Sequence, residues 1–205
     1  MRTEEVIERF KATGALLEGH FVLSSGLHSP NYLQCALVLQ HPADAERLGR
    51  AIAEKFKDQG IQLVASPAIG GIVIGHEVAR ALGARFIWTE RENGEMTLRR
   101  GFSVTPGERT VIVEDVVTTG GSTRDTVKAL QGAGANVLAA ASIIDRSGGG
   151  ADVGVPRIAL ATLNVPTVDP AECELCKRGE AAIKPGSRKT GGRRQEQSAG
   201  GSTND

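Results

Sequence analysis

Short apolar segments alternate with longer amphipathic segments between residues 61 and 163. The short segments are typical of buried strands, and the longer ones have the spacing of helices that bury one face. This alternation predicts right-handed βαβ units, and therefore an α/β fold with a doubly wound, mainly parallel sheet flanked by helices. The predicted strands are 61–66, 85–89, 109–114, 137–144 and 158–163, and the predicted helices are 72–82 and 122–132.

The residues before this region show helical and β-type patterns in turn. Thr3 is a candidate N-cap of a helix that ends near Gly14. Two β-prone runs surround a turn within 21–39. A second helix is predicted from Pro42 through residue 59, with Gly60 as its stop.

The C-terminal residues lack the large apolar side chains that a packed segment needs. After Ile183 the chain is rich in Gly, Ser and charged residues. Such a composition cannot bury enough apolar surface to offset the entropy cost of ordering. We therefore predict one domain over 1–183 and a disordered tail over 184–205.

Composition narrows the class of partner. The chain has 205 residues, 40% of them hydrophobic, and a formal net charge of +0. Bulk charge therefore gives no reason to expect nucleic acid or a membrane surface as a partner. No apolar stretch reaches the length of a membrane span, and the first ten residues lack the apolar core of a signal peptide. With three cysteines, the chain is expected to be cytoplasmic and reduced.

The segment 111–123, VIVEDVVTTGGST, joins a predicted strand to the helix that follows it. Ligands of open α/β sheets bind outside the carboxyl ends of the strands, and a helix N-terminus attracts anions. Gly120 and Gly121 permit a close backbone approach, so this hydroxyl-rich loop suits a phosphate monoester. Because carboxylates repel phosphate, Glu114 and Asp115 are expected to face another part of the ligand, such as paired ribose hydroxyls. Neither a Walker A loop nor a dinucleotide fingerprint is present.

This segment resembles the loop that binds 5-phosphoribosyl 1-pyrophosphate (PRPP) in the type I phosphoribosyltransferases. The alternative is a plain strand–helix connection, which would leave two adjacent acids without a use. The resemblance implies that Glu114 and Asp115 are the catalytic pair, which orients the ribose and favours developing positive charge. The PRPP-binding residues that it implies are Arg91, Glu114, Asp115, Val116, Val117, Thr118, Thr119, Gly120, Gly121, Ser122, Gly70 and Gly71.

Three further segments resemble the orotate phosphoribosyltransferases, in a shorter bacterial and archaeal branch, so that the resemblance extends to about residue 180. These segments are FVLSSGLHSPNYLQ (21–34), SPAIGGIVIGHEVARALG (66–83) and IIDRSGG (143–149). Orotate is a planar carboxylate, which one arginine can hold bidentately. The resemblance implies that Arg146 and Thr118 contact orotate, and an ion pair between Arg146 and Asp145 is the alternative. It also implies a substrate-side hood from about residues 1–40, a homodimer, and Mg²⁺ held without direct side-chain ligation.

The chain departs from the family pattern in its cations. Many members have a long mobile loop with several Lys and a His, whereas the equivalent 89–102 is short. Many also have Lys where this chain has Ser24 or Ile69. We expect Arg91, with Arg99 or Arg100, to replace these cations. A β-hairpin that turns at Asn93-Gly94 is compatible with that role.

The cysteines and histidines give a weaker signal. Cys173 and Cys176 form a C-x-x-C pair, which is half of a zinc site. Reduced cysteines without a function are the favoured interpretation, and a zinc site shared across a dimer is the alternative. The histidines are scattered without metal-ligand spacing, and His28 is expected to be a turn residue.

The predicted function is transfer of the phosphoribosyl group from PRPP to orotate, giving orotidine 5′-monophosphate and pyrophosphate in pyrimidine (UMP) biosynthesis. One alternative is a phosphoribosyltransferase for another base, which Arg146 and the 21–34 segment disfavour. The other is a PRPP-binding regulator without catalysis. Such regulators usually carry a DNA-binding domain, and residues 1–60 show no basic recognition helix.

Overall fold

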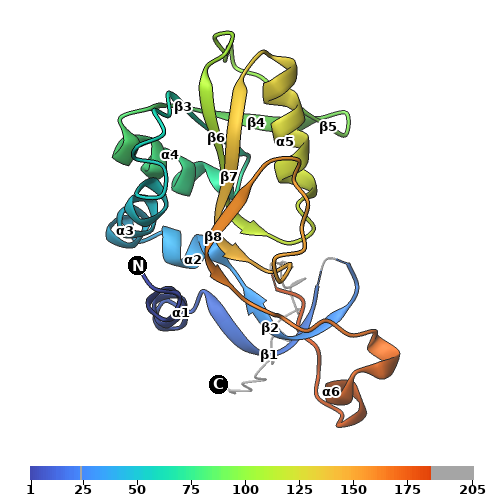
Figure 1. Ribbon diagram of the computed structural model, residues 1–205. Helices are drawn as coiled ribbons and strands as arrows, with labels where there is room; N and C mark the ends of the chain where they lie inside the picture. The colour runs from blue at the N-terminus through green and yellow to red at the C-terminus, as the bar shows by residue number, and fades with distance from the viewer. Residues whose placement is uncertain (24, 186–205) are drawn as a thin grey trace, which may run out of the picture.

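The computed structural model describes residues 1–23 and 25–185. Their main sheet has the strand order β5-β4-β3-β6-β7-β8 (Figure 1). Every neighbouring pair in it is parallel except β4 and β5, which form a hairpin. The strands are β3 (Leu63–Pro67), β4 (Arg85–Glu92), β5 (Glu95–Leu98), β6 (Arg109–Val117), β7 (Asn136–Asp145) and β8 (Arg157–Thr162).

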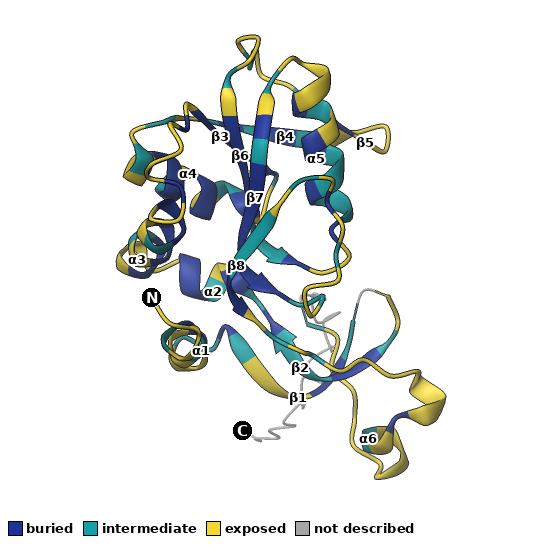
Figure 2. Ribbon diagram, viewed as in Figure 1, coloured by how far each residue is buried: buried dark blue, intermediate teal, exposed yellow. Residues whose placement is uncertain are grey.

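Helices cover both faces of this sheet (Figure 1). Helices α3 (Pro42–Ala53) and α4 (Gly71–Leu82) pack on one face, and α5 (Gly121–Gly132) packs on the other. Successive side chains of a strand point to opposite faces, so Val111 and Val113 join the first core cluster and Ile112 joins the second. Figure 2 shows the central strands buried on both sides. The doubly wound α/β prediction is confirmed.

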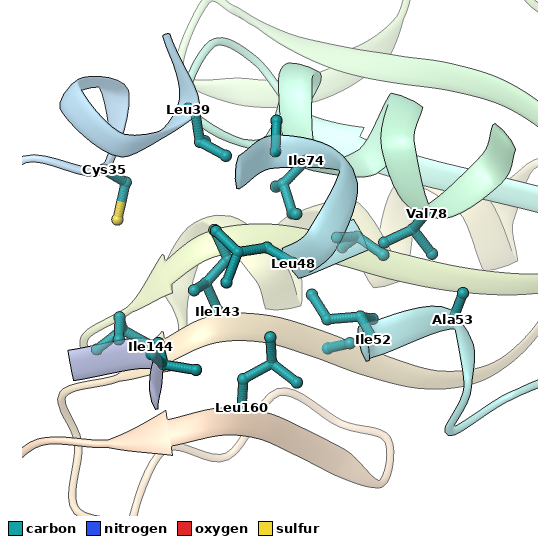
Figure 3. Close-up of a cluster of buried hydrophobic side chains, with 14 of the residues drawn as sticks. Cys35, Leu39, Leu48, Ile52, Ala53, Ile74, Val78, Ile143, Ile144 and Leu160 are labelled. Carbon is teal, nitrogen blue, oxygen red and sulfur yellow. The ribbon is translucent and has the colours of Figure 1, made fainter. Parts of the chain in front are cut away.

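The larger core cluster lies between the sheet and the helices α3 and α4 (Figure 3). Leu48 and Ile52 of α3 meet Ile74 of α4 and Ile143 of β7, and all four are fully or almost fully buried. Burial of one such side chain stabilises a fold by roughly 1.5–3 kcal/mol. Helix α1 (Thr3–Ala12) adds Val6 and Phe10 to the same cluster.

A separate antiparallel hairpin, β1 (Leu16–Val22) and β2 (His28–Leu33), forms the hood. A two-stranded hairpin is marginally stable alone. It is joined by residues 164–185, which we call the C-terminal strap and which contain η1 (Pro170–Glu172) and α6 (Glu174–Lys177). The strap runs beside the hairpin (Figure 1), and single bridges pair Phe21 with Ile183 and His28 with Val168.

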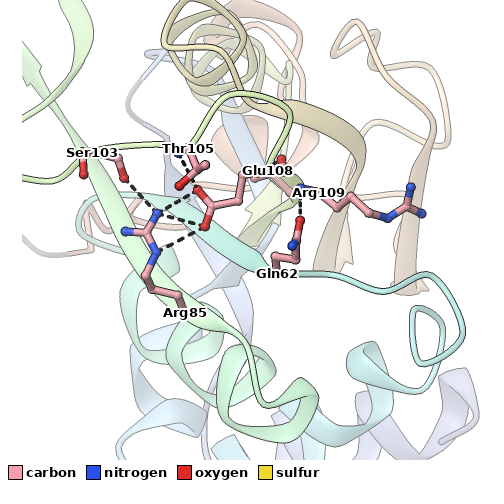
Figure 4. Close-up of polar contacts among 7 residues, drawn as sticks. Gln62, Arg85, Ser103, Thr105, Glu108 and Arg109 are labelled. Carbon is pink, nitrogen blue, oxygen red and sulfur yellow. Dashed lines mark hydrogen bonds and ion pairs between the residues drawn. The ribbon is translucent and has the colours of Figure 1, made fainter.

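The amino edge of the sheet, where the parallel strands begin, is fixed by polar contacts (Figure 4). Arg85 at the start of β4 forms an ion pair with Glu108, with 2.8 Å between nitrogen and oxygen, and also donates to the Ser103 carbonyl. The Arg109 backbone N–H donates to the Gln62 side chain. These contacts lie at the opposite edge from the loops that follow the strands.

Two sequence-based assignments before β3 were wrong. Residues 35–39, expected within a β-prone run, form helix α2, because Cys35, Val38 and Leu39 at helical spacing all reach the core. Helix α3 ends at Ala53 and not at residue 59, since hydrogen bonds between residues three apart, such as Phe56 N–H to Ala53 C=O, follow it.

The expected cap of the first helix and the expected end of one strand also differ. Thr3 is the first residue of α1 and not its cap, and its hydroxyl donates to the Leu160 carbonyl. Strand β6 continues to Val117 because its pairing with β7 extends to Asp145. Ser24 lies outside the described residues, as does the predicted disordered tail beyond residue 185.

Candidate active site

A cavity of about 830 Å³ lies between the carboxyl edge of the sheet and the hood. Thr118 and Thr119, which follow β6, line it together with Arg146, which follows β7. Tyr32 of β2 lines the hood side. The structure therefore brings the predicted phosphate loop and the predicted orotate arginine to one cavity.

The loop after β6 is shaped to present backbone N–H groups. Gly120 adopts the left-handed conformation with φ of +77°, and a Cβ there would lie 2.8 Å from a methyl carbon of Val153. Helix α5 begins at Gly121, and no described side chain caps it. Its first turn therefore leaves N–H donors and the positive end of the helix dipole for a bound anion. Thr118 and Thr119 are exposed beside them.

The carboxyl group of Glu114 is largely buried within β6. Burial raises the pKa of Glu114 to about 7, while a hydrogen bond donated by the Thr123 hydroxyl lowers the pKa and the neighbouring charge of Asp115 raises it. Thr123 belongs to α5, so the helix that presents the phosphate loop also orients this acid. Near neutral pH, this carboxyl group is poised between its two protonation states.

Asp115 contacts the loop before α4. A Cβ on Gly70 would lie 2.8 Å from both carboxylate oxygens, so the absence of a side chain permits this approach. Burial raises the pKa of Asp115, whereas hydrogen bonds from the Val116 N–H and the Cys35 thiol lower it. The Ala68–Ile69 peptide bond in this loop is cis. The predicted catalytic pair and the predicted pyrophosphate loop are therefore in contact.

Arg146 is half-buried, and its Nε atom has no hydrogen-bond partner within the described residues. Burial lowers the pKa of its guanidinium from the ordinary value. Asp145 forms its ion pair with Arg157 instead, at 2.9 Å, and accepts hydrogen bonds from Ser147. The alternative that Arg146 forms an ion pair with Asp145 was wrong, and the Arg146 Nε donor has no partner among the described residues.

The expected hairpin at 92–100 is confirmed, since β4 and β5 pair on both sides of Asn93-Gly94. Its arginines form ion pairs with acids. Arg91 lies 3.0 Å from Asp125 of α5, and Arg100 lies 2.6 Å from Glu90 and over the ring of Trp88. Among the described residues, Arg91 does not line the cavity. Its role toward PRPP stays a prediction.

The sequence left some members of the site unrecognised. The thiol of Cys35, at the start of α2, donates to Asp115, and Tyr32, Val165 and Thr167 line the cavity. Cys35 carries no motif, and Val165 and Thr167 are brought to the site only by the course of the strap. Glu114, Asp115, Gly70 and Gly71 lie outside the cavity lining found among the described residues.

A parallel sheet with an acid pair before a hydroxyl-rich loop at a helix N-terminus defines a phosphoribosyltransferase. The family model for the phosphoribosyl transferase domain matches residues 36–156. A solved orotate phosphoribosyltransferase from Aeropyrum pernix superposes with a TM-score of 0.63 and 27% identity, covering 77% of this chain and 93% of that one.

Two relatives show which family of phosphoribosyltransferases the chain belongs to. An orotate phosphoribosyltransferase of Pelotomaculum thermopropionicum is 53% identical over 92% of this chain and 100% of its own length. One from Thermotoga maritima is 50% identical over 90% of this chain and 97% of its own. The chain belongs to the orotate phosphoribosyltransferase family.

Proposed function

We propose that the protein transfers the 5-phosphoribosyl group of PRPP to orotate and releases pyrophosphate, as a step of pyrimidine (UMP) biosynthesis. One observation carries the proposal. The half-buried guanidinium of Arg146 and the hydroxyls of Thr118 and Thr119 line the same cavity beside an anion-binding helix N-terminus. The cavity thus offers recognition of a planar carboxylate next to recognition of a phosphate.

The 5-phosphate binds at the start of α5. Thr118, Thr119 and Ser122 offer hydroxyl donors, and the backbone of Gly120 and Gly121 approaches closely. Val116 and Val117 hold this loop in place, since their pairing with Ile144 and Asp145 continues β6 to its edge. The phosphate therefore anchors the sugar at a fixed distance from the acid pair.

Glu114 and Asp115 accept hydrogen bonds from the ribose hydroxyls. In the reaction, the bond between C1 and the pyrophosphate oxygen breaks, and its electron pair leaves with pyrophosphate. A ring nitrogen of orotate then forms the new bond to C1, and its proton is released to solvent. The developing positive charge on the ribose is stabilised by the ionised acids, and no protein nucleophile is needed.

The leaving pyrophosphate binds the loop before α4. Gly70 and Gly71 permit close approach of backbone N–H groups there, and Gly70 already contacts Asp115. Arg91 contributes a cation, for which it must exchange its ion pair with Asp125 for the ligand. Arg146, with Thr118, holds the carboxylate of orotate on the opposite side of the ribose.

Mg²⁺ fits the chemistry of this site. Both acids are hard oxygen donors, and burial raises the pKa of each, so positive charge nearby would favour their ionised forms. When bound with PRPP, Mg²⁺ supplies positive charge to the pyrophosphate group. Glu114 and Asp115 act on it through the ribose hydroxyls and not as direct ligands.

The test is the loss of orotate absorbance when PRPP and Mg²⁺ are added to the purified protein. Arg146→Ala should raise the KM for orotate by at least about tenfold, because a charge-assisted bond of 1.5–3 kcal/mol is lost. Arg109→Ala is the matched control, since Arg109 lies at the opposite edge of the sheet. Unchanged orotate binding in Arg146→Ala contradicts the assignment.

The alternatives give different results in the same assay. Turnover with adenine, hypoxanthine or uracil but not orotate indicates another base. PRPP binding without any turnover indicates a regulator. The orotate-named relatives at about 50% identity favour the proposed base.

We further propose that the protein is a cytoplasmic homodimer without nucleic-acid partners. No helix in residues 1–23 or 25–185 is long and apolar enough to span a membrane. Formal net charge is +0, which gives no electrostatic attraction to a polyanion.

A further inference from the structure

We propose that this protein binds one structural zinc ion per chain through His20, His28, Cys173 and Cys176. The ligand atoms of these four side chains all lie within 4.8 Å of one another. They come from one chain, two from the hood and two from the strap, about 150 residues apart in sequence. We call them the His₂Cys₂ cluster.

The distances within the cluster fit tetrahedral coordination. His20 Nε2 lies 2.8 Å from His28 Nδ1 and 3.4 Å from the Cys173 sulfur, and the Cys176 sulfur lies 3.2 Å from His28 Nδ1. Zinc bonds of the usual length at tetrahedral angles separate such ligand atoms by roughly 3.3–3.8 Å. Small side-chain movements therefore suffice to place an ion between the four atoms.

The second ring nitrogen of His20 fixes its tautomer. His20 Nδ1 lies 2.8 Å from the Glu180 carbonyl oxygen, which can only accept. Nδ1 therefore carries the proton, and the lone pair of Nε2 points into the cluster. A backbone carbonyl behind a metal-binding histidine is the usual support of such a ligand.

Burial favours a closed structural site. The exposed fractions are 4% for His20, 8% for His28 and 2% for Cys173, and Cys176 is the exposed member at the rim. Four protein ligands fill a tetrahedral shell and leave no open position for catalysis. Two imidazoles and two thiolates suit zinc better than Mg²⁺ or Ca²⁺.

Apart from the His₂Cys₂ cluster, few buried side chains hold the strap against the hood. Cys173 is its only buried residue over 164–185. Figure 2 shows most of the strap exposed on both sides of this point. Backbone bonds near His28 and His20, such as Val168 N–H to His28 C=O at 2.9 Å, also join the strap to the hood. A metal bound by both segments would join them as a hydrophobic core does elsewhere.

The strap also forms one wall of the cavity, through Val165 and Thr167 before the cluster and Pro185 after it. Bound zinc would therefore hold this wall in place. This consequence, unlike the metal site itself, rests on the proposed function of the cavity. The sequence-based expectation that the cysteines have no function gives way to this proposal, as does the alternative of zinc shared across a dimer.

The first experiment is elemental analysis of protein purified under reducing conditions without chelator. One zinc per chain is expected, and binding should release the protons of the two thiols. The double variant Cys173→Ser/Cys176→Ser should lose at least nine-tenths of the metal, whereas His76→Asn, which changes an exposed histidine outside the cluster, should keep it. Half an ion per chain, or zinc retained by the double variant, would overturn the proposal.

A second readout keeps the proposal testable if a variant folds poorly. Zinc-free wild-type protein titrated with Co²⁺ should gain the visible bands and the thiolate charge-transfer absorption of a tetrahedral sulfur-containing site. Adding zinc should bleach them and raise Tm by about 5 °C or more. A Co²⁺ spectrum without thiolate absorption would count against the site whether or not the protein turns over orotate.

Discussion

Glu114 shows how strongly the pKa of one side chain depends on its position in this fold. Its carboxyl group lies in the second half of strand β6, and its one protein hydrogen bond among the described residues comes from Thr123. Desolvation there disfavours the charge that a ribose-binding acid needs. The site therefore holds a carboxylate that is costly to ionise until a ligand with hydroxyl donors arrives.

The raised pKa of Glu114 predicts a pH-dependent stability. The folded protein binds this proton up to about pH 7, whereas the unfolded chain releases it near the ordinary value of 4.5. Stability contributed by this group therefore falls as pH rises from 4.5 to 7. Glu114→Gln should be more stable than wild type at pH 8, by up to about 3 kcal/mol, and should match it near pH 4.

Urea unfolding of both proteins across this pH range measures the difference. Glu54→Gln, a change at an exposed acid directly after α3, is the control and should follow wild type. A constant gap between Glu114→Gln and wild type at every pH would show that the pKa of Glu114 is not raised in the folded state.

At the scale of elements, the site is formed where two strand–helix connections meet. The loop from β6 to α5 carries the proposed phosphate-binding residues, and the loop from β3 to α4 carries Gly70 and Gly71. The two meet where Gly70 packs against Asp115. Their spacing is fixed because β3 and β6 are direct parallel neighbours.

Gly70→Ala should damage activity far more than stability. Its backbone is already helical, so alanine meets no conformational penalty, but the new methyl group would lie 2.8 Å from the Asp115 carboxylate oxygens and displace them. We expect kcat/KM for PRPP to fall by at least about tenfold, because a displaced acid no longer meets the ribose.

Gly132→Ala at the end of α5 is the matched control. A Cβ there meets no atom within 4 Å, and alanine favours the helix by up to about 1 kcal/mol. Kinetics and thermal unfolding of both variants give the comparison. Full activity in Gly70→Ala would mean that the contact with Asp115 does not position the acid.

At the scale of the whole molecule, the hood, the sheet edge and the strap enclose the cavity together. No single segment provides the wall, since Tyr32, Arg146 and Val165 come from three distant parts of the chain. Ile69, in the loop before α4, is 84% accessible, so this edge of the sheet exposes an apolar side chain as well as polar ones.

The proposed homodimer can be tested by the mass of the protein in solution. Sedimentation equilibrium of the full chain should give twice the chain mass of 21.5 kDa. The family resemblance motivates this expectation, because the mobile loop of its members acts on the partner's site. A single species of 21.5 kDa at working concentrations would contradict it.

The sequence by itself determined the local features of this protein. Apolar periodicity placed the strands and helices of the sheet, because burial on both faces leaves a continuous apolar run. The segment from Glu114 to Ser122 predicted a phosphate-binding connection, because its acids, glycines and hydroxyls are neighbours in the chain. The turn at Asn93-Gly94 was likewise predicted from the sequence, since those residues suit a tight hairpin.

Only the tertiary structure decided which distant side chains meet. Asp145 pairs with Arg157, which leaves the Arg146 Nε without a partner among the described residues, and no local pattern shows that choice. His20 and Cys176 lie 156 positions apart and meet because the strap returns to the hood. Chain spacing reports contacts within one element or one turn, whereas contacts between segments depend on the path of the whole backbone.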